Sequence, residues 1–180
     1  MRFITALSAK LTCPKPNARP IRHNGQVPDR NGKIFYTSNA SLSHISKVAG
    51  IVERLINEKE YVEFLIGRDG DFDQIVSSTV RRAKRDYRDD NSELIWVMAY
   101  LKAEYSNDSD SFDAYYDRVE VCDEAARSHP KGAIQIRNRS MVDRSDLVVC
   151  YVDRQSGGAF QTMEYAKKIG KTVINIADPD

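Results

Sequence analysis

The sequence predicts an α/β fold in which helices cover both faces of a mainly parallel β-sheet. Apolar runs typical of buried strands alternate with amphipathic helical segments, at the spacing of right-handed strand–helix–strand units. Glycine-containing turns join two of these runs to the helices that follow them. The length of 180 residues and the 41% hydrophobic content are those of one compact domain.

The first half of the predicted domain contains two strand–helix pairs. Residues 33–36 are the first predicted strand, and the helix after it carries apolar side chains on one face between residues 45 and 56. Residues 62–66 are the second strand. A turn over residues 67–70 leads from it into a helix whose apolar face spans residues 72–83.

The second half repeats this alternation around a longer irregular passage. Residues 93–100 are the third predicted strand, and the acidic residues 104–117 are expected to form a loop. Strands at 147–152 and 172–176 flank a helix that begins near Gly158. This order predicts a Rossmann-like fold, in which ligands bind outside the carboxyl ends of the strands.

The N-terminal segment differs in composition from the rest of the chain. Residues 1–31 contain six basic residues and one acidic residue, and strand periodicity does not extend beyond the first few positions. The sequence therefore predicts a basic, proline-rich flexible extension over residues 1–31 and a ligand-binding domain over residues 32–180. The segment holds four of the six prolines of the chain: Pro14, Pro16, Pro20 and Pro28.

Charge and cysteine content restrict the compartment and the partners. The 27 Lys and Arg residues balance 26 Asp and Glu residues, so the chain as a whole offers no strong attraction for nucleic acid or an anionic membrane. Its three cysteines cannot form a closed disulfide set. Cys150 lies in an apolar strand and is interpreted as a core residue. No run approaches the roughly 20 apolar residues of a membrane span, and we expect a cytoplasmic protein.

The sequence predicts neither a metal site nor a bound cofactor. His23, His44 and His129 do not stand at metal-ligand spacings. The aspartates between residues 108 and 117 lack the glycine and the terminal glutamate of a calcium loop, and are interpreted as solvated. No Ser-His-Asp or Cys-His nucleophile pattern is evident.

A paired glycine after the strand at residues 147–152 is the strongest indication of a ligand site. Gly157 and Gly158 allow a sharp turn and a close approach of backbone to ligand. The first N–H groups of the next helix are unpaired donors at the positive end of its dipole, where anions bind. Arg137 precedes the same strand and, in a parallel sheet, would reach the same crevice.

These residues resemble a known family. Arg137, Met141, Gly157-Gly158 and Glu164 fall at the spacings of the Lonely Guy (LOG) phosphoribohydrolase pattern, R-K-x-x-M followed by P-G-G-x-G-T-x-x-E. The chain resembles still more the YpsA-like branch of the SLOG superfamily, which joins LOG proteins to the DNA-processing protein DprA. This resemblance covers roughly residues 33–177 and rests on the phrases at residues 64–73, 115–117, 133–139, 141–146 and 157–159.

The resemblance implies a pocket for a nucleotide or a nucleotide-derived small molecule. If the protein is an enzyme, it implies N-glycosidic hydrolysis, in which Arg137 holds phosphate or sugar and Glu164 supports an oxocarbenium-like transition state. LOG relatives commonly form dimers, which implies a homo-oligomer. The implied ligand-binding residues are Gly67, Arg68, Asp69, Gly70, Asn138, Gly157, Gly158 and Ala159.

Structural roles compete with each functional assignment. Arg137 could cap or pair on a helix surface, and Glu164 could pair with Lys167 or Lys168 on a solvated helix face. Gly67 and Gly70 could simply form a tight turn, with Asp71 as the helix cap.

Departures from the LOG pattern leave the activity open. Ser156, Phe160 and Gln161 stand where proline, glycine and threonine are expected, so the phosphate cradle is altered. One alternative is a non-catalytic nucleotide-ligand sensor. Another is DprA-like binding of single-stranded DNA, which would need a local basic patch because the overall charge disfavours it.

Overall fold

The computed structural model describes residues 3–8 and 42–178, and side chains from residue 44 onward. Strands and helices alternate along most of this chain, as the sequence predicts. In chain order the elements are β1 (Phe3–Ser8), α1 (Leu42–Glu58), β2 (Val62–Ile66), α2 (Asp71–Asp86), β3 (Ser92–Met98), α3 (Ala103–Asn107), α4 (Ser109–Tyr115), β4 (Arg118–Val121), α5 (Asp123–Ala126), α6 (Pro130–Arg144), β5 (Leu147–Tyr151), α7 (Gly158–Lys168) and β6 (Thr172–Asn175).

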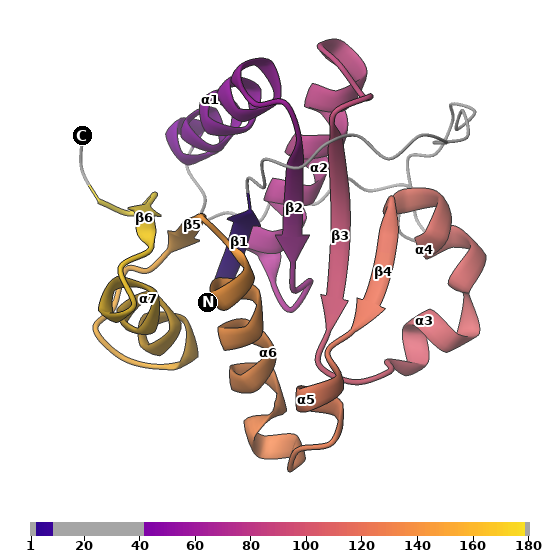
Figure 1. Cartoon of the computed structure of the whole chain (residues 1–180), viewed down its shortest axis with the longest axis vertical. Coiled ribbons are helices and arrows are strands. Elements are labelled where there is room, and N and C mark those ends of the chain that lie inside the picture. The colour runs from indigo at the N-terminus through magenta and orange to yellow at the C-terminus, as the bar shows by residue number, and fades with distance from the viewer. Residues whose placement is uncertain (1–2, 9–41, 179–180) are drawn as a thin grey trace.

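The strands form a six-stranded sheet in the order β4-β3-β2-β1-β5-β6 (Figure 1). β2 is parallel to β3, β3 to β4 and β5 to β6, whereas β1 is antiparallel to both of its neighbours, β2 and β5. Because β1 is reversed against both, β2 and β5 also point the same way. The prediction of a mainly parallel α/β sheet is therefore confirmed, with one reversed strand at its centre.

The central strand comes from the segment that was predicted to be an extension. Residues 3–8 lie between β2 and β5, with Thr5 opposite both Ile66 and Val149. The predicted extension over residues 1–31 is therefore wrong for residues 3–8. A central strand pairs its backbone N–H and C=O groups on both sides. This pairing stabilises a strand that the short apolar run alone does not predict. The predicted strand at residues 33–36 lies outside the described residues.

One face of the sheet is covered by α1 and α2. Alternate side chains of β2 and β3, among them Phe64 and Trp96, point to this face and form one buried cluster with Val52 of α1 and Val76 of α2. Alternation with a period of two places these side chains on the same side of the sheet. The two helices also pack against each other.

The opposite face is covered by α6 and α7, so helices lie on both faces (Figure 1). Leu65 and Val97 point to this side and pack against Met141 of α6. Val148 of β5 packs against Ala166 of α7. Cys150 is fully buried here, and burial raises the pKa of its thiol to about 12, which confirms its interpretation as a core residue.

The acidic passage after β3 is helical rather than irregular. Residues 104–117, predicted as a loop, contain most of α3 and all of α4. Tyr105 and Phe112 bring their rings to 5.9 Å and 5.0 Å from the ring of Trp96. This packing stabilises helices that are too short to be stable alone. The acidic composition of the segment predicts a loop because it does not show that these aromatic side chains pack on Trp96.

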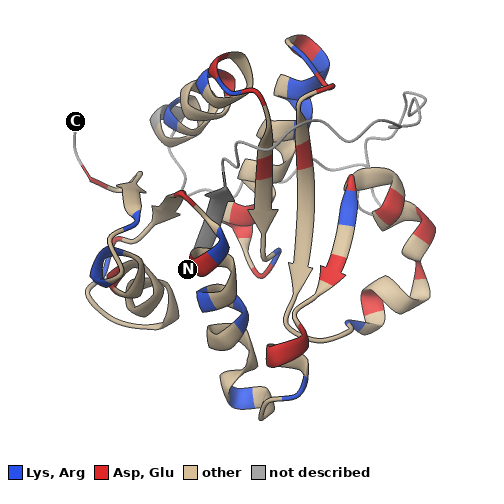
Figure 2. Ribbon diagram, viewed as in Figure 1, with Lys and Arg blue, Asp and Glu red and all other residues tan. Residues whose placement is uncertain are grey.

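Charged residues of both signs are distributed over the described surface. In Figure 2, acidic positions recur on α3, α4 and α5, and basic positions recur along α6. Among the described helices, none combines the length and the apolar character that a bilayer-spanning segment requires.

Asn91 ties the end of α1 to the start of β3. Its side chain is buried, and Nδ2 donates hydrogen bonds to the carbonyls of Ile56 (2.8 Å) and Lys59 (2.9 Å). We expect Asn91→Ala to lower the free energy of unfolding by about 1–3 kcal/mol, because the carbonyl of Ile56 in a buried bond and that of Lys59 in a half-buried bond lose their donor. Urea unfolding measures this change. Asn57→Ala, at an exposed position of α1, is the matched control and should change stability by less than about 0.5 kcal/mol.

Candidate functional site

The strand order changes direction at β1, so the loops after β2 and β5 lie on either side of this strand. We call the region between these two loops the crevice, because open α/β sheets are expected to bind ligands there. β2, β3 and β4 lead to one edge, and β5 and β6 lead to the other. The loop after β2 enters α2 on one face, whereas the loop after β5 enters α7 on the opposite face. Open α/β sheets bind ligands where such loops diverge, at the carboxyl ends of the strands. Both predicted glycine turns lie there.

Arg137 lies at one wall of this crevice. Its side chain, from the middle of α6, is only 3% exposed. Nη1 donates a hydrogen bond of 2.8 Å to the carbonyl of Val97 in β3, and Nη2 forms an ion pair with Asp69. Nε is buried without a hydrogen-bond partner among the described residues. A guanidinium kept this far from water requires partners for its charge, and the loop after β2 supplies one.

Gly67 provides the surface on which the guanidinium lies. A Cβ at this position would be 2.8 Å from Cζ of Arg137 and 2.9 Å from Nη2, closer than side chains pack. The absence of a side chain therefore lets Arg137 approach the end of β2. This is a stronger requirement than the tight turn considered from the sequence.

Asp69 joins Arg137 to a second cation. Its Oδ1 accepts a hydrogen bond of 2.6 Å from Nζ of Lys102, which lies just before α3. Burial alone would raise the pKa of Asp69. The positive charges of Arg137 and Lys102 outweigh that effect and hold the pKa below its ordinary value of 3.8. The carboxylate is consequently ionised at neutral pH.

Arg68 faces the other side of the same turn. It is the non-glycine residue with positive φ in the described chain, at 54°, a conformation that costs free energy for a residue with a Cβ. Its guanidinium lies 4.7 Å from the ring centre of Phe112 and 5.1 Å from that of Trp96, and donates to Glu104 at 2.8 Å. These contacts hold Arg68 over the aromatic cluster.

The start of α2 is organised differently from the prediction. Gly70, rather than Asp71, is the N-cap, and it makes no side-chain capping bond. Asp73, buried in the first turn, accepts the N–H of Asp69 at 3.0 Å. This bond attaches the backbone of the Asp69 turn to the helix.

The second glycine turn forms the opposite wall. Gly157 has φ of 91°, in the region that favours glycine, and α7 begins after it without a side-chain cap. A Cβ on Gly158 would lie 2.5 Å from Nε2 of Gln135, a residue of α6 two positions before Arg137. Ala159 is buried against Cys150. The helix α6 thus contacts both glycine turns.

The two turns are separated by the width of the central strand. β1 lies between β2 and β5, and neighbouring strands are about 4.8 Å apart, so the strand ends that lead into the two turns are about 10 Å apart. Asn138, next to Arg137, is buried in the same region at 8% exposure. The structure therefore places Gly67 against Arg137 and Gly158 against Gln135, so that α6, which also carries Asn138, links the two turns.

Glu164 lies elsewhere. Its side chain is half exposed on α7 and pairs with Lys167 at 3.3 Å, the i,i+3 pair that a solvated helix face produces. The buried face of α7 is formed by Ala159, Thr162, Met163 and Ala166. The position of Glu164 agrees with the alternative interpretation of this residue rather than with a place beside Arg137.

Lys102, Glu104 and Gln135 were not predicted as site residues. Lys102 and Glu104 contact the charged residues of the turn after β2, and Gln135 contacts the turn after β5. Lys102 follows a strand end, which is the positional signal that could have found it. Gln135 carries no comparable signal in a single sequence.

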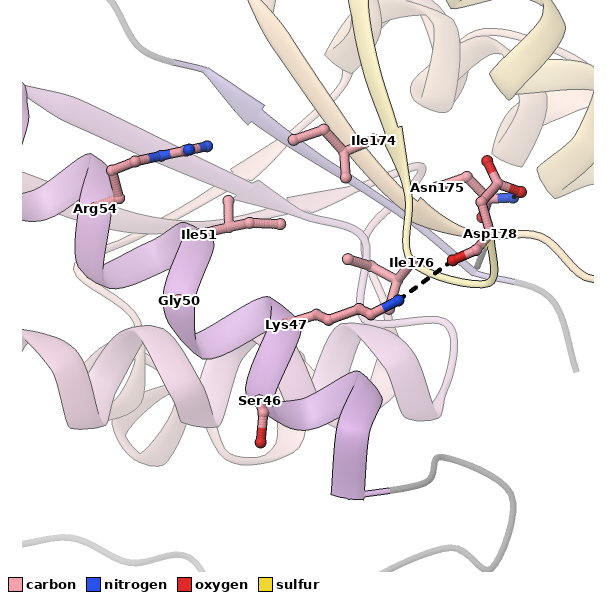
Figure 3. A pocket seen from close by; sticks show the side chains of 9 residues that line it. All are labelled: Ser46, Lys47, Gly50, Ile51, Arg54, Ile174, Asn175, Ile176 and Asp178. Carbon is pink, nitrogen blue, oxygen red and sulfur yellow. Dashed lines mark hydrogen bonds between the residues drawn. The ribbon is translucent and has the colours of Figure 1, made fainter. Parts of the chain in front are cut away.

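A separate open cleft lies between α1 and β6. It has a volume of about 400 Å³ and includes Lys47 and Arg54 on one side and Ile174 and Asp178 on the other (Figure 3). Two of its polar side chains are engaged within the protein: Lys47 donates to the carbonyl of Asp178 at 3.3 Å, and Asn175 donates to the carbonyl of Val152 at 3.0 Å. None of the predicted site residues lines it.

Comparisons with known proteins leave the resemblance as a prediction. A scan against protein-family models and searches of curated proteins and solved structures find no match to this chain. Among the described residues, no group of three or more His, Cys, Asp or Glu side chains is arranged to hold a metal ion. The functional argument therefore rests on the geometry of the crevice.

We expect Gly67→Ala to destabilise the protein by about 1–3 kcal/mol, because the added methyl group forces Arg137 away from Val97 and Asp69. Urea unfolding measures the loss. Gly50→Ala is the matched control: it lies within α1 with open space around its Cα, and should stabilise by about 0.5–1 kcal/mol. Equal effects of the two substitutions would show that Gly67 does not support Arg137.

The lowered pKa of Asp69 predicts a specific acid sensitivity. A carboxyl whose pKa is depressed by folding contributes stability that is complete above its unfolded pKa and is lost as the pH falls through its folded pKa. As the pH falls below about 4, the ordinary range of an aspartate pKa, Asp69→Asn should therefore lose less stability than the wild type. Urea unfolding at a series of pH values measures how the free energy of unfolding of each protein depends on pH. If the two proteins lose stability in parallel, Asp69 is not a carboxyl whose pKa is lowered by folding.

Proposed function

We propose that this protein binds a nucleotide or a nucleotide-derived small molecule in the crevice between the turns after β2 and β5. The observation that supports this most strongly is Arg137, a buried guanidinium that lies against Gly67 at the carboxyl ends of β2 and β3. Arg presents a planar set of donors suited to phosphate and carboxylate groups. Lys102 adds a second positive charge nearby.

The opposite wall suits another part of the same ligand. The turn at Gly157–Gly158 lies at the N-terminus of α7, where partial positive charge accumulates. The ends of β2 and β5 are about 10 Å apart, so a ligand that contacts both turns must be longer than a single phosphate. A phosphorylated sugar, with or without its base, has that extent and has polar groups along its length.

The geometry supports binding more directly than hydrolysis. N-glycosidic hydrolysis, as in the LOG proteins that the sequence resembles, needs a carboxylate near the sugar carbon. Glu164 is instead exposed and paired with Lys167. This observation favours the non-catalytic sensor as the second candidate, in which the ligand binds and is released unchanged.

Ligand binding should raise the thermal unfolding midpoint of the full chain in a screen of AMP, ADP, NAD and ADP-ribose. A ligand at 100 times its Kd adds about 2.7 kcal/mol of stability, or roughly 5–10 °C for a chain of this size. Lys102→Gln should reduce the increase, because it removes one of the two cations at the Asp69 turn. The increase should be unchanged in Lys47→Gln, the matched control in the cleft between α1 and β6.

Chromatography of the same mixtures separates the two candidate functions. Release of free base by the wild type and its loss in Glu164→Ala would establish a hydrolase, whereas recovery of the intact ligand would establish a sensor. If none of these compounds shifts the midpoint, or if Lys47→Gln alone abolishes the shift, the proposed site is wrong.

A further inference from the structure

Asp69 binds the two cations that an anionic ligand would need. Its two carboxylate oxygens are divided between them: Oδ2 pairs with Nη2 of Arg137, and Oδ1 accepts from Nζ of Lys102. Arg137 and Lys102 come from different elements, α6 and the segment after β3, and meet at this carboxylate. In this arrangement the carboxylate occupies the position of a bound anion.

We propose that Asp69 is an internal competitor for the anion site, and that a ligand carrying a doubly charged anionic group binds by displacing the Asp69 carboxylate from Arg137 and Lys102. This inference rests on the proposed function and identifies the residue that limits affinity there. Asp69 is accordingly not a contact that holds the ligand, as the sequence resemblance implied, but a group that the ligand replaces.

The charge balance determines which anions can compete. Arg137 and Lys102 carry two positive charges, and Asp69 pairs with both. Glu104 also lies 3.9 Å from Lys102, but its closer partner is Arg68 at 2.8 Å, so Asp69 is the one carboxylate shared by the two cations. Once the carboxylate has left, two positive charges remain, and a group with two negative charges compensates both. A singly charged group would only reproduce the balance that Asp69 already provides, and so gains little by replacing it.

The structure allows the carboxylate to leave without unfolding the site. The side chain of Asp69 is 28% exposed, whereas that of Arg137 is 3% exposed, so the carboxylate is the partner with a route to water. The backbone N–H of Asp69 is bonded to Asp73. Rotation of the side chain therefore suffices, and the turn keeps its place.

Arg137 stays in position when Asp69 leaves. Its Nη1 is bonded to the Val97 carbonyl, and its guanidinium lies on Gly67. The incoming anion meets a guanidinium that is already oriented, which reduces the entropy lost on binding.

The test is calorimetric titration of the full-length protein with sulfate, a doubly charged anion at neutral pH. Asp69→Asn removes the competing charge and keeps the size of the side chain. It should bind sulfate at least about tenfold more tightly than the wild type, which corresponds to about 1.4 kcal/mol. Nitrate, with one charge, should gain much less from the substitution.

Glu120→Gln is the matched control. Its carboxylate also pairs with an arginine, Arg144, and its side chain is 24% exposed, close to the value for Asp69. It changes the net charge of the protein by the same amount on the edge strand β4, beside Val97 of β3, while its ion pair is with Arg144 rather than with Arg137 or Lys102. Sulfate affinity should therefore stay at the wild-type level. A similar gain in both variants would attribute the effect to net charge and overturn the proposal.

A second variant keeps the proposal testable if Asp69→Asn does not fold. Lys102→Gln removes one of the two positive charges, and should weaken sulfate binding by about tenfold or more. Unchanged sulfate affinity in Lys102→Gln would overturn the displacement mechanism. So would an Asp69→Asn protein that folds but gains no affinity.

The same titrations distinguish failure of this inference from failure of the proposed function. If the nucleotides bind the wild type and Asp69→Asn with equal affinity, the crevice binds its ligand and only the displacement is wrong. If neither protein binds sulfate or any of the nucleotides, the proposed function and the inference are both wrong.

Discussion

The candidate site depends on the enclosure of one guanidinium. Arg137 is surrounded by the ends of β2 and β3, donates to a strand carbonyl and lies on a glycine that leaves space for it. A buried cation is costly unless it is paired, and loss of its partner typically costs about 3–5 kcal/mol. Asp69 is that partner, so the conformation of the turn after β2 and the position of α6 depend on each other.

This dependence connects stability to ligand binding. Asp69 stabilises the unliganded fold by pairing with both Arg137 and Lys102, and the same contacts oppose an external anion. The strained Arg68, held over Trp96 by cation–π contact and by Glu104, keeps the turn in the conformation that presents Asp69. Binding sites often hold polar groups and strained backbone in this way, at a cost to the stability of the fold.

The sequence predicts the periodic part of the structure and the residues around the crevice, but not their contacts. The strands at 62–66 and 147–152 and the helix after Gly158 follow from apolar periodicity and glycine turns. The central strand at residues 3–8 and the helices within residues 104–117 depend on tertiary pairing and on packing against Trp96, which local patterns do not contain. Glu164 shows the same limit: its spacing from Gly157 is compatible with either face of α7, and packing of α7 on β5 and α6 decides between them.

The most direct test of this account is a crystal structure of the protein soaked with sulfate or with a nucleotide that stabilises it. We predict an anionic group between the guanidinium of Arg137 and Nζ of Lys102, with the Asp69 side chain rotated toward solvent and Arg137 still bonded to Val97. An anion bound only in the cleft between α1 and β6, with the Asp69 pairs intact, would contradict the account.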